Sequence, residues 1–496
     1  MGQLFYENLI FDYDESENKS LLEVLRDNKI YVNAPCGGNK TCGKCLVEVY
    51  NGNFIQNGNI VSVSSQKILA CENIPLGNIN MPQISKNEIL FENFLDNNSS
   101  HNGEIGVAID IGTTTIAAYF YLINSKKLIA IKSAVNEQNS VGADVMSRLQ
   151  FYIEHDKSDV LHNIIINQIN NIILEVSANC GLSTEKITKI IIAGNTVMEH
   201  FFSGVDPSPI AEMPYVPNSL FGIEELAFSL GLKANRRAIV YTAPCVSGFV
   251  GGDITIGIMA CNLDKIDKNV LYIDIGTNGE IALKSNGQII CCATAAGPAF
   301  EGANISSGMI AEGGAISKVS QKNGSLSIKT IANKPAIGIC GSGIIDAVAT
   351  FLDLNIIDET GKILCSDMVK LAENVYITQK DIREIQVAKA AISAGIITLL
   401  GAAGITQNDV ETVILAGGFG EKINPSSAIK IGLIPAFPLE IIQTVGNASG
   451  NGACKILLDY DEIDRLQEFS ECCKYIELSE NSEFNEEYIN QMIFPQ

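Results

Sequence analysis

The sequence predicts an α/β protein in which a small N-terminal domain precedes a duplicated core. Three observations carry this prediction. The stretch Gly106–Phe120, GVAIDIGTTTIAAYF, joins two apolar runs through a glycine–threonine turn, and Val270–Lys284 repeats it with IDIGT intact. Four cysteines lie among glycines near the N-terminus. At 496 residues, the chain is also too long for a single hydrophobic core.

The composition is that of a globular protein and excludes some classes of partner. Hydrophobic residues make up 46% of the chain and charged residues 18%, which suits a packed core. The net charge of −22 argues against nucleic acid and anionic membranes, because both need a basic surface. The N-terminus lacks the pattern of a signal peptide. Residues 390–407 are uncharged but interrupted by glycines, so we expect a buried helix there, not a membrane span. We therefore expect a cytoplasmic protein.

The first 82 residues are expected to form one domain. LFYENLIFDYD predicts a β-hairpin, and Ser20 followed by Glu23 predicts a helix that begins with a capping box. Residues 83–104 are polar and end in Asn, Ser and Gly. We expect them to form a linker that lets the first domain move relative to the rest.

Four cysteines of this domain have the spacing of a cluster site. They follow the pattern Cys-x5-Cys-x2-Cys-x25-Cys: Cys36, Cys42, Cys45 and Cys71. Structural zinc usually shows two Cys-x2-Cys pairs, and unliganded core cysteines would not gather with glycines in a loop. A [2Fe–2S] cluster fits best. Plant-type ferredoxins have four residues in the first gap. Five residues there resemble the adrenodoxin-like ferredoxins, which implies a β-grasp domain that carries one electron at a time.

The duplicated motif predicts a site for phosphate and a metal ion. In each copy a buried strand ends at an aspartate, Asp110 or Asp274, which a tight glycine–threonine turn follows. The N–H and hydroxyl groups of such a turn suit phosphate, and the carboxylate suits hydrated Mg²⁺. One such turn would be an ordinary hairpin. Two copies, with the strand VILAGGFG downstream, indicate a functional site.

Further along the core, apolar strands end repeatedly in glycine-rich turns. We expect a long helix over residues 158–179, and Asp253 in GGDIT opens another helix. Asp253 is a third candidate carboxylate, with a helix N-cap as the alternative. His200 is expected to be a packed or capping histidine. Lys389 is expected on a solvated helix face, although it has the length to reach a nucleotide.

Two domains that each begin with a strand–Asp–Gly–Thr hairpin resemble the actin, sugar kinase and Hsp70 ATPase superfamily. That resemblance implies a duplicated ribonuclease H-like fold, with residues 105–266 and 267–496 as the two halves. It implies that Asp110 and Asp274 hold Mg²⁺ through water and orient a hydrolytic water, with Asp253 as a further catalytic candidate. It assigns these residues to the nucleotide: Gly112, Thr113, Thr114, Thr115, Gly276, Thr277, Asn278, Gly279, Gly341, Ser342, Gly343, Asp346, Gly417, Gly418 and Phe419.

The order of motifs after the cluster domain resembles that of the reductive activators of corrinoid proteins. These motifs are GNTVMEH, GGDIT, GPAFEG, CGSGIID, LAGGFG and GNASGNGA. The resemblance implies that ATP drives an electron from the [2Fe–2S] cluster to cob(II)alamin on a methyl-transferring corrinoid protein, which restores cob(I)alamin. It also implies a low-potential electron donor and a homodimer. Two other functions stay open: a metabolite kinase with an appended ferredoxin domain, and an electron-transfer module that senses nucleotide without turnover.

Overall fold

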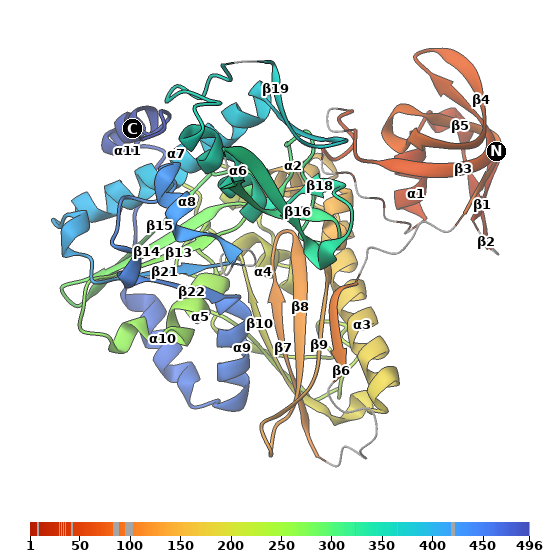
Figure 1. Ribbon diagram of the computed structural model, residues 1–496. Coiled ribbons are helices and arrows are strands. Elements are labelled where there is room, and N and C mark those ends of the chain that lie inside the picture. The colour runs from red at the N-terminus through yellow and green to blue at the C-terminus, as the bar shows by residue number, and fades with distance from the viewer. Residues whose placement is uncertain are drawn as a thin grey trace.

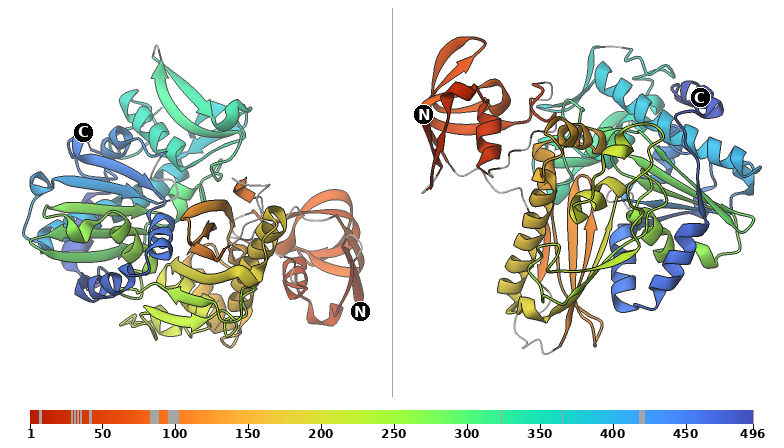
Figure 2. Two further views of the ribbon diagram at one scale, coloured as in Figure 1. Left: turned by 90° about the horizontal axis from the view of Figure 1, so that it is seen from below. Right: turned by 180° about the vertical axis from the view of Figure 1, so that it is seen from behind.

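Three large sheets follow one another along the chain and organise the protein (Figure 1). The computed structural model describes residues 1–6, 9–28, 30, 32, 34, 36–40, 43–82, 89–94, 103–322, 324–364, 366–417 and 422–495. Seen from below and from behind, the N-terminal sheet stands beside the other two and meets them along one side (Figure 2).

The N-terminal domain is a five-stranded sheet with one helix packed on it. The strand order is β2-β1-β5-β3-β4. The expected hairpin is confirmed by the antiparallel pairing of β1 with β2. The helix α1 begins after Ser20, and both hydrogen bonds of the expected capping box with Glu23 are present. The elements are β1 (Gly2–Tyr6), β2 (Leu9–Tyr13), α1 (Leu21–Asp27), β3 (Leu46–Gln56), β4 (Asn59–Leu69) and β5 (Ile74–Met81).

The second sheet has seven strands in the order β11-β12-β10-β7-β8-β9-β6. Its centre is the predicted hairpin, in which β7 pairs antiparallel with β8 and parallel with β10. The elements are β6 (Ile89–Phe94), β7 (Ile105–Ile111), β8 (Thr115–Leu122), β9 (Lys127–Val135), η3 (Glu137–Ser140), α2 (Val145–Glu154), α3 (Val160–Cys180), β10 (Ile187–Gly194), α4 (Thr196–Ser203), β11 (Ile223–Leu226), β12 (Ile239–Thr242) and α5 (Gly252–Ala260).

Residues 83–104, which the sequence predicts to be a linker, contain a strand. This strand, β6, pairs antiparallel with β9 at the edge of the second sheet. Without this strand, β9 would present a row of unpaired backbone groups at the sheet edge. Pairing with β9 therefore favours a strand here, although the composition of the segment is polar. Residues 83–88 and 95–102 lie outside the described part of the chain.

The third sheet repeats the arrangement of the second. Its order is β22-β21-β13-β14-β15-β23, and β13 pairs antiparallel with β14 and parallel with β21. The elements are β13 (Val270–Ile275), β14 (Gly279–Ser285), β15 (Gln288–Thr294), η7 (Pro298–Glu301), β16 (Ala315–Lys322), β17 (Ser325–Thr330), β18 (Gly338–Ile339), α6 (Gly341–Asp353), β19 (Met368–Ala372), β20 (Val375–Thr378), α7 (Gln379–Ala402), β21 (Thr412–Ala416), α8 (Pro425–Lys430), β22 (Ile442–Gly446), α9 (Ala448–Leu458), α10 (Glu462–Cys472), β23 (Cys473–Tyr475) and α11 (Ser482–Asn490).

Helices α5 and α9 lie between the two larger sheets (Figure 1). At Gly452 of α9, a Cβ atom would lie 2.4 Å from the carbonyl oxygen of Ile256, so only glycine allows this approach to α5. At Gly106 of β7, a Cβ would lie 2.6 Å from the side chain of Leu457. A helix from the second half therefore packs directly on the central strand of the first half.

Helix α7 runs through the core of the second half. Among the described helices it alone is long and apolar enough to cross a membrane, but 78% of its most apolar window is buried within the protein. The expectation of a buried helix is confirmed. The expectation of a solvated Lys389 is wrong, because its Nζ is covered by the C-terminal segment and donates to the carbonyl oxygen of Ile493 at 2.6 Å. The C-terminal segment reaches Lys389 only through packing between residues far apart in the sequence.

Candidate functional site

Two described cysteines of the N-terminal domain meet from separate segments of the chain. The Sγ atoms of Cys45 and Cys71 are 3.2 Å apart. Burial and this contact raise the pKa of the Cys71 thiol to about 12, and the charge of Cys36 adds to the effect. Cys42 lies outside the described residues. Three glycines of the loop have positive φ of 65°, 110° and 65°, a conformation that glycine adopts freely: Gly37, Gly38 and Gly43. Thiols gathered by a folded-back loop fit an iron–sulfur cluster.

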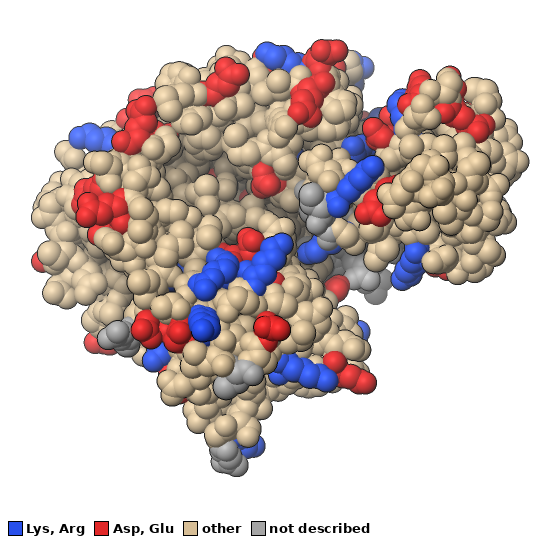
Figure 3. All heavy atoms as spheres, turned by 90° about the horizontal axis from the view of Figure 1, so that it is seen from above, with Lys and Arg blue, Asp and Glu red and all other residues tan. Residues whose placement is uncertain are grey.

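A cavity of about 440 Å³ lies between the two halves. Its walls come from the two predicted phosphate loops, residues 112–115 and 276–278, and from α5, α6 and α9. In Figure 3 this part of the molecule is hollowed, with the N-terminal domain standing beside the hollow. Thirteen of the residues predicted from the sequence line the cavity: Asp110, Gly112, Thr113, Thr114, Thr115, Asp253, Asp274, Gly276, Thr277, Asn278, Gly341, Ser342 and Gly417.

Three other predicted residues are placed elsewhere. Gly279 and Gly343 serve close packing, since a Cβ at Gly343 would lie 2.1 Å from the carbonyl oxygen of Ile316. Asp346 is buried and accepts a hydrogen bond from the Ser427 hydroxyl at 2.6 Å, which joins α6 to α8. The structure therefore does not bring these residues to the cavity. Gly418 and Phe419 lie outside the described residues.

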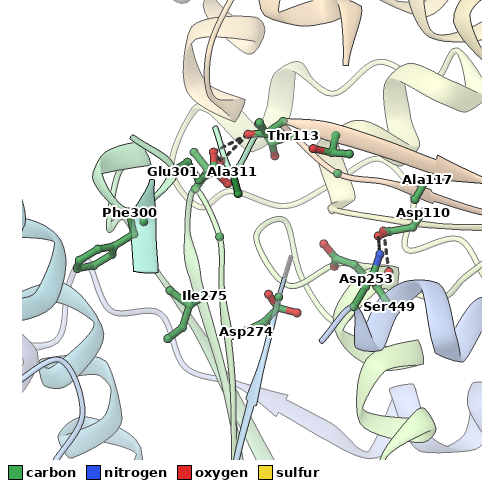
Figure 4. A pocket seen from close by; sticks show the side chains of 18 of the residues that line it. Asp110, Thr113, Ala117, Asp253, Asp274, Ile275, Phe300, Glu301, Ala311 and Ser449 are labelled. Carbon is green, nitrogen blue, oxygen red and sulfur yellow. Dashed lines mark hydrogen bonds between the residues drawn. The ribbon is translucent and has the colours of Figure 1, made fainter. Parts of the chain in front are cut away.

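Asp110 is held at the end of β7 by the start of α9. The side-chain amide of Asn447 donates to Asp110 Oδ2 at 2.7 Å, and the Ser449 hydroxyl donates to Oδ1 at 2.8 Å (Figure 4). Burial raises the pKa of Asp110, and the two hydrogen bonds oppose that rise. The packing of α9 on β7 thus fixes both oxygens of this carboxylate.

Asp253 and Asp274 point into the same space as Asp110 (Figure 4). Burial and the charges of its two neighbours raise the pKa of Asp253 to about 8. Burial and the charge of Asp110 raise the pKa of Asp274 to about 7. Asp253 is not the N-cap of α5, because that position belongs to Gly251. It is one of three carboxyl groups that disfavour one another's ionisation.

The donor set of the cavity fits a divalent cation and a phosphate chain. Closely spaced carboxylates are stabilised when a hard cation binds between or near them, and Mg²⁺ prefers oxygen ligands and water. The N-terminus of α6, with Gly341 and Ser342, opens onto the cavity beside the two threonine turns. Helix N-termini and free turn amides suit phosphate oxygens. The residues present therefore fit a magnesium–nucleotide complex.

Several residues of the cavity were not predicted from the sequence. They are Asn195, Glu280, Glu301, Lys422, Asn447 and Ser449. Glu301 stands out, because it accepts hydrogen bonds from the hydroxyls of Thr114 at 2.5 Å and Thr277 at 3.0 Å, one from each half. The motifs GPAFEG and GNASGNGA mark the segments that carry three of these side chains. No local signal shows which residue of each motif faces the cavity.

His200 is buried in α4, as expected for a packed histidine. Its Nδ1 lies 2.7 Å from the carbonyl oxygen of Thr196, and the N–H of Ser219 donates to Nε2 at 3.3 Å. Burial lowers its pKa. The backbone therefore engages both ring nitrogens of this histidine.

Models of known families match three consecutive parts of the chain. The 2Fe-2S iron-sulfur cluster binding domain matches residues 10–75. The RACo middle region matches residues 105–266, and the C-terminal domain of RACo, described as the ASKHA domain, matches residues 268–496.

Known proteins resemble the chain over most of its length. The corrinoid activation enzyme RamQ of Eubacterium limosum is 32% identical over 441 residues, which cover 83% of this chain and 73% of the relative. The [Co(II) methylated amine-specific corrinoid protein] reductase of Methanosarcina barkeri is 25% identical, over 78% of this chain and 77% of the relative. The solved structure of a reductive activator for a corrinoid, iron-sulfur protein is 28% identical and superposes with a TM-score of 0.74, covering 100% of this chain and 99% of that one. The chain thus belongs to the family of corrinoid reductive activators, in which a ferredoxin-type domain precedes an actin-like ATPase domain.

Proposed function

We propose that this protein uses ATP to drive one electron from a [2Fe–2S] cluster to the cobalt(II) of a corrinoid protein. The cluster is oxidised by one electron and the cobalt is reduced to cobalt(I), the state that accepts a methyl group. One observation carries the proposal: a single chain holds a buried pair of thiols, Cys45 and Cys71, within a cluster-type cysteine spacing, and a carboxylate-lined cavity between two predicted phosphate loops. The names of the two relatives support it.

The proposed ligands of the cluster are Cys36, Cys42, Cys45 and Cys71. The proposed divisions of the chain are a ferredoxin-type domain (1–82), a connecting segment (83–104) and two ATPase halves (105–266 and 267–496). The matched family models, which begin and end close to these limits, support the division.

Asp110 and Asp274 are proposed to have different roles in ATP hydrolysis, one holding the metal ion and the other acting as the base. Asp110, fixed by Asn447 and Ser449, is suited to hold a hydrated metal ion in one position. Asp274 receives a long hydrogen bond of 3.3 Å from Tyr272 and has a pKa of about 7, which suits a base that orients the attacking water. Mg²⁺, when bound, neutralises charge on the phosphates.

The free energy that the uphill electron transfer requires is similar in size to a coupling free energy between two binding sites. Plant-type clusters have potentials near −400 mV, and the cob(II)/cob(I) couple is expected to lie lower. A gap of about 100–150 mV corresponds to roughly 2–3.5 kcal/mol for one electron. Coupling free energies between two binding sites are of this size, so nucleotide-driven rearrangement suffices.

The family resemblance further supports a homodimer, a cytoplasmic location and a low-potential electron donor. These three features are part of the proposal. Size-exclusion chromatography with light scattering measures the first of them directly.

An anaerobic reduction assay tests the function. The protein, a low-potential reductant and a cob(II)alamin-loaded corrinoid protein are mixed with and without MgATP, and the cob(I) absorption band is followed. We expect the band only with MgATP. Cys71→Ala should abolish the band and leave nucleotide binding intact, whereas Cys472→Ala, at an exposed cysteine of α10, should behave as the wild type.

The same assay separates the alternatives. A band that forms with a non-hydrolysable ATP analogue as fast as with ATP, over repeated cycles, would indicate a nucleotide sensor without turnover. Phosphorylation of a small metabolite, with no cob(I) band for any corrinoid protein, would indicate a kinase. Either outcome overturns the proposal.

A further inference from the structure

Glu301 joins the two phosphate loops through one carboxylate oxygen. The hydroxyls of Thr114 and Thr277 both donate to Glu301 Oε2, at 2.5 Å and 3.0 Å. Figure 4 shows Glu301 directly beside the tip of the first loop, close to Thr113. These two hydroxyls belong to the set proposed to bind nucleotide phosphate. A phosphate oxygen would compete with the carboxylate for them, because both are negatively charged acceptors.

The residue after Glu301 contacts the N-terminal domain. The ammonium group of Lys44 donates to the carbonyl oxygen of Gly302 at 3.4 Å. Gly302 has a φ of +79°, and a Cβ there would lie 2.6 Å from the backbone nitrogen of Met309. Gly302 directly follows Glu301 in the chain, so a main-chain shift that withdraws Glu301 from the two loops also displaces this carbonyl.

A second contact between the domains is made by Arg26 of α1. Its guanidinium group donates to the carbonyl oxygen of Gly37 at 3.1 Å and also to that of Ser140 in η3. It also lies 5.7 Å from the centre of the Phe151 ring of α2. Arg26 thus joins the cysteine loop of the first domain to η3 and α2 of the second.

The segment around η3 is bonded directly to the first phosphate loop. Asn136, just before η3, donates through its side chain to the carbonyl oxygen of Gly112 at 2.9 Å and through its N–H to that of Thr114 at 2.8 Å. Arg148 of α2 is fully buried and donates to the carbonyl oxygen of Thr113 at 2.5 Å. The contacts of Arg26 and Lys44 are thus made to two segments, the one around η3 and the residues beside Glu301. Both of these segments hydrogen-bond the first phosphate loop.

Two of the proposed cluster ligands, Cys36 and Cys45, are chain neighbours of residues at the docked contact. These residues are Gly37 and Lys44. An electron acceptor that needs close approach to the cluster reaches it from this side of the domain only when the contacts with Ser140 and Gly302 are released.

We propose that Glu301 is a positioning residue that couples nucleotide binding to the docking of the cluster domain. Phosphate takes the hydroxyls of Thr114 and Thr277, Glu301 leaves them, and the Gly302 carbonyl moves away from Lys44. The docked contact weakens, and this side of the cluster domain becomes accessible to the corrinoid partner. Coupling between two equilibria is reciprocal, so loss of the docked contact must strengthen nucleotide binding. The inference rests on the proposed function only in taking the cavity as the nucleotide site.

Calorimetric titration of the full-length protein with Mg²⁺ and a non-hydrolysable ATP analogue tests this coupling. Glu301→Ala and Lys44→Ala are both expected to bind the analogue at least about five-fold more tightly than the wild type. Glu301→Gln, which keeps the shape and loses the charge, should fall between. Lys67→Ala, at an exposed lysine of β4 in the same domain, is the matched control and should bind as the wild type does. A purely structural role for Glu301 predicts weaker binding instead.

Small-angle X-ray scattering supplies the second measurement. The analogue should increase the radius of gyration of the wild type, and it should cause no increase in Glu301→Ala. Failure of the wild type to bind the analogue would contradict the proposed function itself. Normal binding by the wild type, with unchanged or weaker binding by both variants, would overturn only the coupling.

Discussion

The two phosphate loops share one backbone pattern but have different surroundings. In each, a central strand ends at an aspartate, turns, and returns antiparallel, beside a parallel strand on its other side. The first loop, Gly112–Thr115, is held by hydrogen bonds from Asn136 and Arg148. Each loop also closes with a backbone hydrogen bond of 2.9 Å, from Gly112 to Thr115 and from Gly276 to Asn278. In the second loop, residues 276–278, the Thr277 hydroxyl donates to Glu301 at 3.0 Å.

The two aspartates differ in the same way. Asp110 accepts two short hydrogen bonds from α9, whereas Asp274 accepts one of 3.3 Å from Tyr272. Strong hydrogen bonds hold a carboxylate in position and favour its charged form, whereas a carboxylate that receives few keeps more basicity and more freedom to move. The comparison teaches that two turns with the same backbone pattern can hold their aspartates differently, because different remote segments pack on them.

The largest expected effect separates the two aspartates by activity. Asp274→Asn should lower the turnover of ATP by about 10²–10³-fold, because an amide cannot act as a base, and should leave nucleotide affinity within a few-fold. Asp110→Asn should chiefly raise the Mg²⁺ concentration needed for half-maximal activity. Phosphate release, measured against Mg²⁺ and ATP concentration, distinguishes the two. Identical profiles for both variants would remove the proposed division of roles.

A second test addresses the stronger support of the first loop. Arg148→Met should lower the free energy of unfolding by about 3 kcal/mol, because several buried carbonyl groups lose their charged donor. Denaturant unfolding followed by circular dichroism measures this value. Arg236→Met, at an arginine stacked over Phe228 outside both loops, is the control and should change stability by less than about 1 kcal/mol. Equal losses in the two variants would argue against special support for the loop.

The raised pKa values predict how stability depends on pH when EDTA removes divalent cations. Asp274 has a pKa of about 7 and Asp253 of about 8, whereas an unfolded aspartate titrates near about 3.9. The folded state therefore holds more protons between these values, and stability falls as pH rises towards 8. Between pH 5 and 8 we expect a loss of a few kcal/mol, because both buried carboxyl groups give up their protons in this range.

Thermal melts at a series of pH values measure this loss. Added Mg²⁺ should flatten the profile, because the cation stabilises the ionised carboxylates. The double variant Asp253→Asn and Asp274→Asn should flatten it without Mg²⁺. A slope that persists in the double variant would place its origin outside this cavity.

The smallest expected effects compare the hydrogen bonds of the two aspartates. Ser449→Ala removes a 2.8 Å bond to Asp110 and should cost about 1.5 kcal/mol of stability. Tyr272→Phe removes the 3.3 Å bond to Asp274 and should cost less than about 0.5 kcal/mol, since long hydrogen bonds are weak. A larger loss of stability for Tyr272→Phe than for Ser449→Ala would contradict the inference that Asp110 is held more firmly than Asp274.

Local sequence patterns were sufficient to predict both hairpins, the capping box at Ser20 and the buried helix α7. Each of these depends on neighbours in the chain: alternating apolar residues, a turn residue with the required φ, or a hydroxyl three residues before a glutamate. Asp110, Asp253 and Asp274 could be proposed as candidates for the same reason, because the two strands that end at aspartate and the helix that begins beside Asp253 were visible in the sequence. The pairing of β6 and the burial of Lys389 could not be predicted, since both depend on remote segments.

By itself, the sequence determined that the chain carries a cysteine loop and two copies of a phosphate turn, because those features are written in short motifs. Only the tertiary structure decided what surrounds them. Asn447 and Ser449 reach Asp110 because α9 of one half packs on β7 of the other. Glu301 reaches Thr114 and Thr277 because the two halves close on one cavity. Contacts between residues hundreds of positions apart are set by how sheets and helices pack, and no local pattern encodes that packing.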